Sequence, residues 1–315
     1  MCGITGFCDF THGSSENLLL TMREELLHRG PDDGGLYWQS LENFQLGLAH
    51  RRLSIIDLSD AAHQPMQSSC GGYWIVFNGE IYNYQRIREE LLQQGEKFLT
   101  NSDTEVILNA YRFYGDGFVD HLKGMFAFVI YDRVNRKLIA SRDRLGVKPF
   151  YYYFDGSIFL FASEVKALLK HPAVKKTINQ EALVTYLKYG YITGNESIFQ
   201  NIKKLEQGSS LALHLDSKTI TKSTYWRADT FFEKEKVKIS YDDFHEALLE
   251  KLKQKARDLG CRSAVLTFVP HPQTILRPDR RLQLLTTYEE RAERLRLFGI
   301  DEIVEQSFNR DFSNL

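Results

Sequence analysis

The chain has 315 residues, of which 43% are hydrophobic and 26% are charged, and its 40 Lys and Arg nearly cancel its 41 Asp and Glu to give a net charge of −1. This balance is typical of a soluble globular protein and excludes a polybasic nucleic-acid binder. The length favours one large domain or two modest ones.

The cysteines and the apolar residues indicate the cellular compartment. Cys2, Cys8, Cys70 and Cys261 are too scattered for a disulfide framework, and no pair has the CxxC spacing of a zinc or redox site. The N-terminus has no basic and apolar leader, and no apolar run reaches the roughly 18 residues that a membrane span needs. We therefore expect a cytoplasmic protein without nucleic-acid or membrane partners.

Short strands dominate the first two thirds of the chain. The run 75–77 predicts a strand that stops at Asn78-Gly79, a dipeptide that favours turns. Apolar residues at three- and four-residue spacing predict helices, with N-caps near Ser102 and at Asn179. The further strands are expected at 126–131, 138–141, 150–153 and 158–162, and the helices at 15–27, 84–94, 103–114 and 180–189.

The composition changes near Asp229. The run Glu233-Lys234-Glu235-Lys236 has the composition of a solvated linker, so we place a first domain at 1–228 and a linker at 229–240. Residues 241–315 form the second part of the chain. There the pattern predicts a helix over 241–258 that ends at Gly260, a strand over 264–268 and a helix over 287–298.

Cys2 is the first candidate for chemistry. Removal of Met1 would leave a thiol and a free α-amine on one residue, and an α-amine titrates near pH 8, low enough to accept the thiol proton. The alternative for an isolated Cys2 is a small buried apolar residue. The motifs elsewhere in the chain decide between the two.

Several ordered motifs resemble the glutaminase domain of class II amidotransferases, specifically that of asparagine synthetases. The resemblance extends from Met1 to about Trp226. It implies an α+β fold, the four-layer αββα sandwich of N-terminal-nucleophile hydrolases, over residues 1–228. The motifs lie at 1–7, 28–35, 49–57, 78–83, 102–105, 124–128, 142–149 and 163–168.

The resemblance assigns the catalytic residues. It implies that the Cys2 thiolate attacks the side-chain amide of L-glutamine, forms a glutamyl thioester and releases ammonia. The side-chain amide of Asn78 and the backbone N–H of Gly79 match the family's oxyanion hole. Considered alone, Asn78-Gly79 would be only a hairpin turn.

The resemblance also assigns the residues that bind glutamine. Arg52 matches the cation for the α-carboxylate, and Glu80 and Asp103 match the anions for the α-ammonium. The backbone around Leu53 and Ile55 would line the same pocket. Considered alone, Arg52 would be a surface ion-pair residue and Asp103 a helix N-cap.

Other polar residues, inside and outside these motifs, have no expected chemical role. Arg29 and Asp32 are expected to support the loop around the site. The histidines His50, His63 and His121 lack the spacing of a metal site, and we expect structural roles and no metal.

The resemblance to a whole asparagine synthetase stops at the first domain. No Ser-Gly-Gly phosphate loop occurs in the chain, so ATP and Mg belong to a synthetase domain that is absent, and the glutaminase needs no cofactor. The sequence leaves two partners open: a second copy of the chain in a homodimer, or a separate synthetase protein. A non-catalytic module that binds glutamine is the alternative function.

The tail resembles a different family. Residues from about 255 to 315 are similar to the nucleotidyltransferase part of bacterial riboflavin kinase/FAD synthetases, which implies a partial α/β, Rossmann-like fragment without a complete nucleotide site. A function related to FMN adenylyl transfer is therefore a weaker alternative. The chimeric character has three possible origins: a gene fusion, an assembly error or deliberate joining.

Overall fold

The computed structural model describes residues 2–53, 63–231, 241–270, 287–307 and 309. The chain divides into two compact units, Met1–Phe231 and Phe232–Leu315. Each unit is described by itself. Within the described residues, no helix is both long and apolar enough to cross a membrane.

One antiparallel sheet of the first unit is built around the N-terminal strand. Its strand order is β10-β8-β9-β1-β3-β2. A Cβ on Gly6 would lie 2.3 Å from the Gly47 carbonyl oxygen, so glycine permits the close contact between β1 and β3. The strands are β1 (Gly3–Asp9), β2 (Asp33–Ser40), β3 (Gln45–Arg52), β8 (Tyr151–Phe154), β9 (Ile158–Ala162) and β10 (Ile202–Lys204).

The second antiparallel sheet carries the predicted oxyanion residues. Its strand order is β12-β11-β7-β6-β5-β4, and β5 packs across β1 and β3 of the first sheet. The expected turn at Asn78-Gly79 is wrong, because β5 continues through both residues to Ile81. The strands are β4 (Met66–Gln67), β5 (Tyr73–Ile81), β6 (Gly124–Asp132), β7 (Lys137–Arg142), β11 (Ser209–His214) and β12 (Thr219–Thr224).

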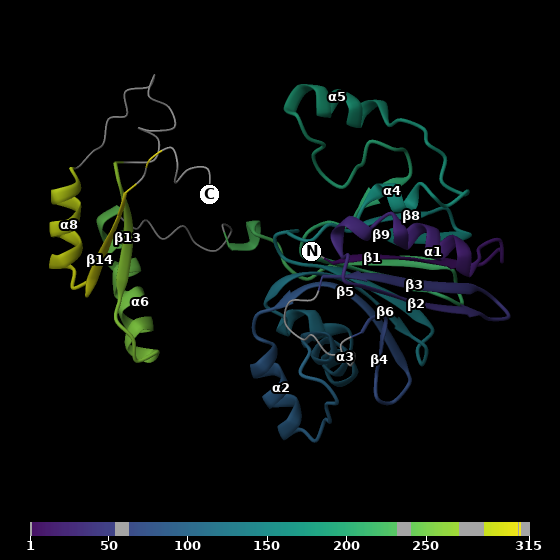
Figure 1. The fold of residues 1–315 in the computed structure, drawn as a ribbon, viewed down its shortest axis with the longest axis horizontal. Helices are drawn as coiled ribbons and strands as arrows, with labels where there is room; N and C mark the ends of the chain where they lie inside the picture. Colours follow the sequence, from purple (N-terminus) through teal and green to yellow (C-terminus); the bar gives the residue numbers. More distant parts are fainter. Residues whose placement is uncertain (1, 54–62, 232–240, 271–286, 308, 310–315) are drawn as a thin grey trace. The chain divides into compact units, whose positions relative to one another are not determined.

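Helices cover the outer faces of both sheets (Figure 1). The side chains of Ser15, Ser102 and Asn179 cap three of them, each by accepting a backbone N–H bond. The helix expected over 15–27 is shorter and is followed by a 3-10 turn at Leu27–Arg29. The α-helices are α1 (Glu16–Glu24), α2 (Tyr84–Gln93), α3 (Asp103–Tyr114), α4 (Val165–Leu168) and α5 (Gln180–Tyr189), and the other 3-10 helices are Gly115–His121 and Asp229–Phe231.

The buried side chains of the first unit show the layers. Among the described residues, one apolar cluster lies between the two sheets and includes Ile4, Val76 and Phe161. A second packs α2 and α3 on β5 and β6, and a third packs α1 and α4 on β1 and β9. This order of layers confirms the αββα sandwich.

The second unit is a small α/β fragment, as predicted. Strands β13 (Ala264–Val269) and β14 (Glu302–Ser307) pair in parallel. Helices α6 (Tyr241–Asp258) and α8 (Tyr288–Leu297) accompany them, and α8 begins with a capping box between Thr287 and Glu290. The Asp301 carboxylate accepts bonds from the backbone N–H and the hydroxyl of Ser263, at 2.7 and 2.6 Å, and so joins the starts of the two strands.

Candidate active site

Strand pairing brings the predicted site residues to one end of the sandwich. Gly3 at the start of β1 pairs with Arg51 near the end of β3, which places Cys2 beside Arg52. The last residues of β5 lie at the same end, because β5 packs across these strands. His50 lies on β3, and its Nε2 is hydrogen-bonded to the carbonyl oxygen of Phe77 on β5 of the other sheet, at 3.1 Å. The predicted nucleophile Cys2, Arg52 and the predicted oxyanion residues on β5 therefore lie at the same end of the sandwich.

The Cys2 thiol is half-buried and held by the backbone of the residue after β3. The N–H of Leu53 donates to Sγ at 3.4 Å, and the thiol lies 3.7 Å from the Leu53 carbonyl oxygen. An N–H donor at sulfur favours the negative charge that a thiolate carries. Leu53, predicted to line the pocket, thus contacts the predicted nucleophile directly.

A buried arginine fixes the main chain of Cys2. Arg29 Nε donates to the Cys2 carbonyl oxygen at 3.0 Å, and its Nη1 forms an ion pair with Glu164 at 3.0 Å. Burial opposes the shift, but hydrogen bonds and charge interactions with Arg29 and His28 hold the pKa of Glu164 below its usual value. Arg29 is therefore a positioning residue, a more specific role than the loop support expected from sequence. Its pairing with Glu164 spans 135 residues, so no local pattern could reveal it.

Asn78 is buried, yet its amide nitrogen has no hydrogen-bond partner among the described residues. Such an unpaired buried donor is costly, so natural proteins keep one where it serves a purpose. The preceding residue is fixed on both sides, because the Phe77 N–H donates to Gln64 Oε1 at 2.6 Å and its carbonyl accepts from His50. Burial lowers the pKa of His50 to about 3, so the His50 side chain that bonds to the Phe77 carbonyl is uncharged at neutral pH.

Gly79 allows β5 and β6 to approach closely beside Asn78. A Cβ at this position would lie 2.3 Å from the Met125 carbonyl oxygen and 2.7 Å from the Phe126 Cα. The glycine is therefore required by strand packing, which explains why the dipeptide is not a turn.

The motif at 142–149 supports the same strand and has no direct chemical role. The Asp143 carboxylate is buried and accepts the Phe126 N–H at 3.1 Å, and Phe126 pairs with Gly79. The same carboxylate closes its own loop by accepting the N–H groups of Leu145, Val147 and Lys148.

Asp103 and Glu80 form an acidic pair at the end of β5. Asp103 is the first residue of α3, and its carboxylate accepts the Ile81 N–H at 3.0 Å. Burial is the main cause that raises the pKa of Asp103 to about 6; the nearby charge of Glu80 adds to the shift, and backbone N–H bonds oppose it. The N-cap of α3 is Ser102, so the alternative role of Asp103 as an N-cap is wrong.

The other predicted residues are placed as follows. Arg52 ends β3, and its carbonyl oxygen accepts the Asp32 N–H at 3.1 Å. Ile55 lies outside the described residues. His63 pairs with Asp33 at 2.7 Å. In the part of the chain that the structure describes, no cluster of three His, Cys, Asp or Glu residues could hold a metal ion.

Two families match the chain over different segments. The glutamine amidotransferase domain family matches residues 1–226, and the FAD synthetase family matches residues 244–315. The two resemblances found in the sequence are therefore confirmed.

Curated relatives of the chain carry asparagine synthetase names. The chain is 38% identical over 266 residues to a Methanocaldococcus jannaschii protein named asparagine synthetase [glutamine-hydrolyzing] 2, covering 77% of this chain and 51% of that protein. It is also 38% identical over 248 residues to asparagine synthetase [glutamine-hydrolyzing] 3 of Bacillus subtilis, covering 77% and 39%. The chain thus spans about half the length of these relatives or less.

Solved structures share the fold at low sequence identity. Glutamine phosphoribosylpyrophosphate amidotransferase from B. subtilis has a TM-score of 0.52 at 15% identity, with coverage of 97% of this chain and 81% of that one. An allosteric regulatory enzyme of purine biosynthesis has a TM-score of 0.53 at 17% identity, with coverage of 97% and 80%. The chain belongs to the glutamine amidotransferase domain family, and its first unit is homologous to the glutaminase half of asparagine synthetases.

Proposed function

We propose that this chain hydrolyses L-glutamine to L-glutamate and ammonia at Cys2, and that the ammonia serves an asparagine-forming synthetase. On this proposal, the glutaminase domain is residues 1–228, the linker is 229–240, and the C-terminal fragment is 241–315. The observation that carries this proposal is the buried, unpaired amide of Asn78 at the same end of the sandwich as the Cys2 thiol.

The reaction runs through a covalent intermediate. Once Met1 is removed, the α-amine of Cys2 accepts the thiol proton, and Sγ attacks the amide carbon of glutamine. The Asn78 amide and the Gly79 N–H stabilise the oxyanion that develops. The C–N bond then breaks, ammonia leaves with the proton, and water hydrolyses the thioester to glutamate and regenerates the thiol.

The substrate's charged end is bound by residues of opposite charge. Arg52 pairs with the α-carboxylate, and Asp103 with Glu80 pairs with the α-ammonium. Binding the ammonium relieves the repulsion that helps to raise the pKa of Asp103. Main-chain groups at Leu53 and around Ile55 complete the pocket.

Glutamate release by the purified full chain tests the proposal. Wild type, with an intact mass that shows the loss of Met1, releases glutamate from glutamine. Cys2→Ala has no measurable activity but keeps the far-UV circular dichroism of wild type. Release that persists in Cys2→Ala would exclude this nucleophile. Glutamine binding without release by the processed wild type would favour the non-catalytic module.

A further inference from the structure

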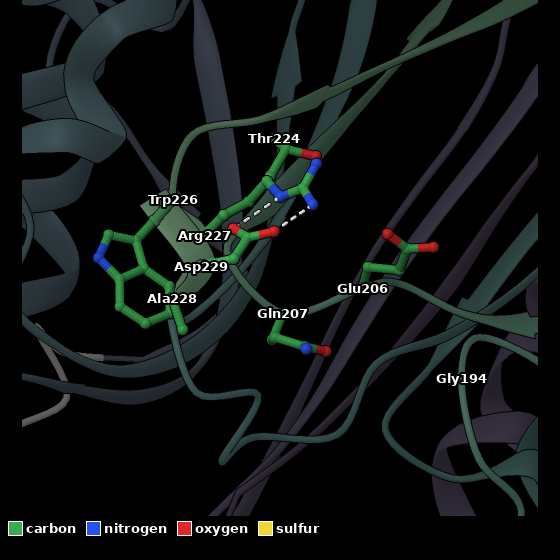
Figure 2. Close-up of a pocket in the computed structure, with 8 residues that line it drawn as sticks. All are labelled: Gly194, Glu206, Gln207, Thr224, Trp226, Arg227, Ala228 and Asp229. Atoms are coloured by element: carbon green, nitrogen blue, oxygen red, sulfur yellow. Dashed lines mark hydrogen bonds and ion pairs between the residues drawn. The ribbon is translucent and has the colours of Figure 1, made fainter. Parts of the chain in front are cut away.

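A polar pocket of about 440 Å³ lies in the first unit (Figure 2). Figure 2 shows the Arg227 and Asp229 side chains turned toward each other, joined by a 3.0 Å bond from Nε. The pocket is lined by Gly194, Glu206, Gln207, Thr224 and residues 226–229. None of these is a predicted site residue, so the pocket adds no residue to the candidate active site. A buried side chain, that of Gln64, does connect to the site.

Gln64 is a buried polar residue whose side-chain amide forms two hydrogen bonds. It is 6% exposed and lies two residues before the start of β4. Its Oε1 accepts the Phe77 N–H at 2.6 Å, and its Nε2 donates to Thr104 Oγ1 at 3.3 Å. An amide side chain offers an acceptor oxygen and a donor nitrogen on one planar group. The Gln64 side chain therefore forms a bridge from β5 to the first turn of α3.

Two connections between β5 and the start of α3 enclose predicted site residues. One is this side-chain bridge, which reaches β5 at Phe77 and α3 at Thr104. The other is the bond from the Ile81 N–H to the Asp103 carboxylate, at 3.0 Å. Residues 78–80, which include the predicted oxyanion residues and one predicted anion for the ammonium, are thus held at both ends.

Gln64 takes the place of a backbone partner beside β5. Within the described residues, β4 pairs with β5 at Ile75 and Trp74. Beyond this pairing, side chains bind both backbone groups of Phe77: Gln64 accepts from its N–H, and His50 bonds to its carbonyl oxygen. The position of the residue that follows Phe77 therefore depends on these two side chains as well as on the pairing with β6.

The main chain of Gln64 is itself held by its surroundings. A Cβ on Gly35 would lie 2.1 Å from the Gln64 carbonyl oxygen, so β2 packs directly against this residue. Met66, two residues further on, is buried in the apolar cluster of β5 and α3. A side chain can position its partners only if it is fixed by its own packing. Gln64 meets this condition through contacts with the first sheet and with the core.

We infer that Gln64 is a positioning residue for the glutaminase reaction, which fixes the Asn78 amide relative to the Asp103 carboxylate. The inference rests on the proposed function. A fixed number of bonds separates the amide carbonyl of L-glutamine from its α-ammonium, so the groups that bind the two ends must lie at a matching separation. Misplacement by about 1 Å can lower a rate about 100-fold. Gln64 acts through its partners Phe77 and Thr104 and takes no part in bond making.

Two substitutions of similar shape test the bridge in the full chain. Gln64→Met keeps the length of the side chain and loses both bonds, whereas Thr104→Val removes only the acceptor of Nε2. Gln64→Met is expected to lower kcat for glutamine about 30-fold and to raise KM about threefold. Thr104→Val should lower kcat about fivefold, because the bridge then reaches only β5. Thr104→Ser, which keeps the hydroxyl, should stay within about twofold of wild type in both constants.

The double variant gives a readout that a merely structural role would not move. Gln64→Met already removes the bond to Thr104, so adding Thr104→Val should lower kcat no further. Two independent losses would instead multiply to about 150-fold. Each rate is measured well below the unfolding midpoint of its variant, so that lost stability does not lower kcat. Effects that multiply, or a kcat of Thr104→Val within about twofold of wild type, would overturn the inference.

Gln67→Met is the matched control. Gln67 lies on β4, three residues after Gln64, and is exposed. Its substitution should leave both kcat and KM unchanged. If Gln64→Met does not fold, Thr104→Val and Thr104→Ser decide: a loss of kcat that serine restores supports the inference, and an equal kcat in both overturns it. Absence of glutamate release by the wild-type chain would instead contradict the proposed function.

Discussion

Asn78, the proposed oxyanion donor, should contribute to catalysis and not to folding, so its substitution tests the proposal. Asn78→Ala is expected to lower kcat by about 100- to 1000-fold, the usual cost of one oxyanion donor. The free energy of unfolding should change by less than about 1 kcal/mol, because the amide nitrogen has no partner to lose. Steady-state glutamate release and urea denaturation measure the two quantities.

Asn109 is the matched control for this prediction. It is also buried, but its amide donates to the Lys97 carbonyl oxygen at 3.0 Å. Asn109→Ala should therefore destabilise the fold by about 1–2 kcal/mol and leave kcat unchanged. The same kcat in Asn78→Ala and wild type would remove Asn78 from the oxyanion hole.

Asp103 should give both activity and stability a pH dependence near pH 6. Its pKa in the folded chain is raised to about 6 from the usual 3.8, so the folded state binds the proton more tightly than the unfolded state. Its contribution to stability is then full below about pH 4 and is lost as pH rises through about 6. Glutamine binding has the opposite trend, since it needs the ionised carboxylate.

Asp103→Asn separates these effects. In wild type, kcat/KM should fall more steeply as the pH drops below about 6, because Asp103 becomes protonated. In Asp103→Asn this extra loss of kcat/KM at low pH should be absent, and KM should be higher than in wild type. Thermal unfolding of the variant between pH 4 and 7 should lack the decline that Asp103 causes in wild type. A steepening that survives in Asp103→Asn would assign it to another group.

At the scale of elements, the register of β5 and β6 depends on a glycine. Gly79→Ala is expected to cost about 1–3 kcal/mol of unfolding free energy, because its Cβ would overlap the Met125 carbonyl oxygen. Gly117→Ala is the control, since no atom lies within 4 Å of its Cβ position. Equal denaturation midpoints for the two variants would contradict the close contact.

Local patterns predicted helices better than strands. Helices α3 and α5 begin and end where the apolar spacing predicts, because their caps and periodicity lie within one segment. Strands β1, β2 and β3 were not recognised, since all three contain glycines, residues that are depleted in strands and interrupt the apolar pattern. Asn78-Gly79 was misread as a turn for the same reason.

The sequence motifs named the residues of the candidate site but did not reveal which of them contact one another. The motifs named Cys2, Asn78 and Asp103, and the structure brings them to one end of the sandwich. The contact between Cys2 and Leu53 depends on the pairing of β1 with β3, and the support from Glu164 depends on β9 lying beside β1. Neither follows from spacing along the chain.

At the scale of the whole molecule, the first unit should fold without the second. The three apolar clusters of the described chain draw every member from residues before 226. Removal of residues 232–315 is therefore expected to leave the main calorimetric transition within about 2 °C of its position in the full chain. Loss of that transition on truncation would contradict the proposed domain boundary.

The position of the nucleophile limits how this fold can be combined with others. Cys2 directly precedes β1, an entirely buried strand paired on both sides. A base supplied by the α-amine of Cys2, as we propose, needs that amine free, so any chain in front of Cys2 has to be removed before the site can act. On this proposal, a partner fused after the last strand of the first unit leaves the nucleophile free, whereas a partner fused before β1 blocks it until it is cleaved off.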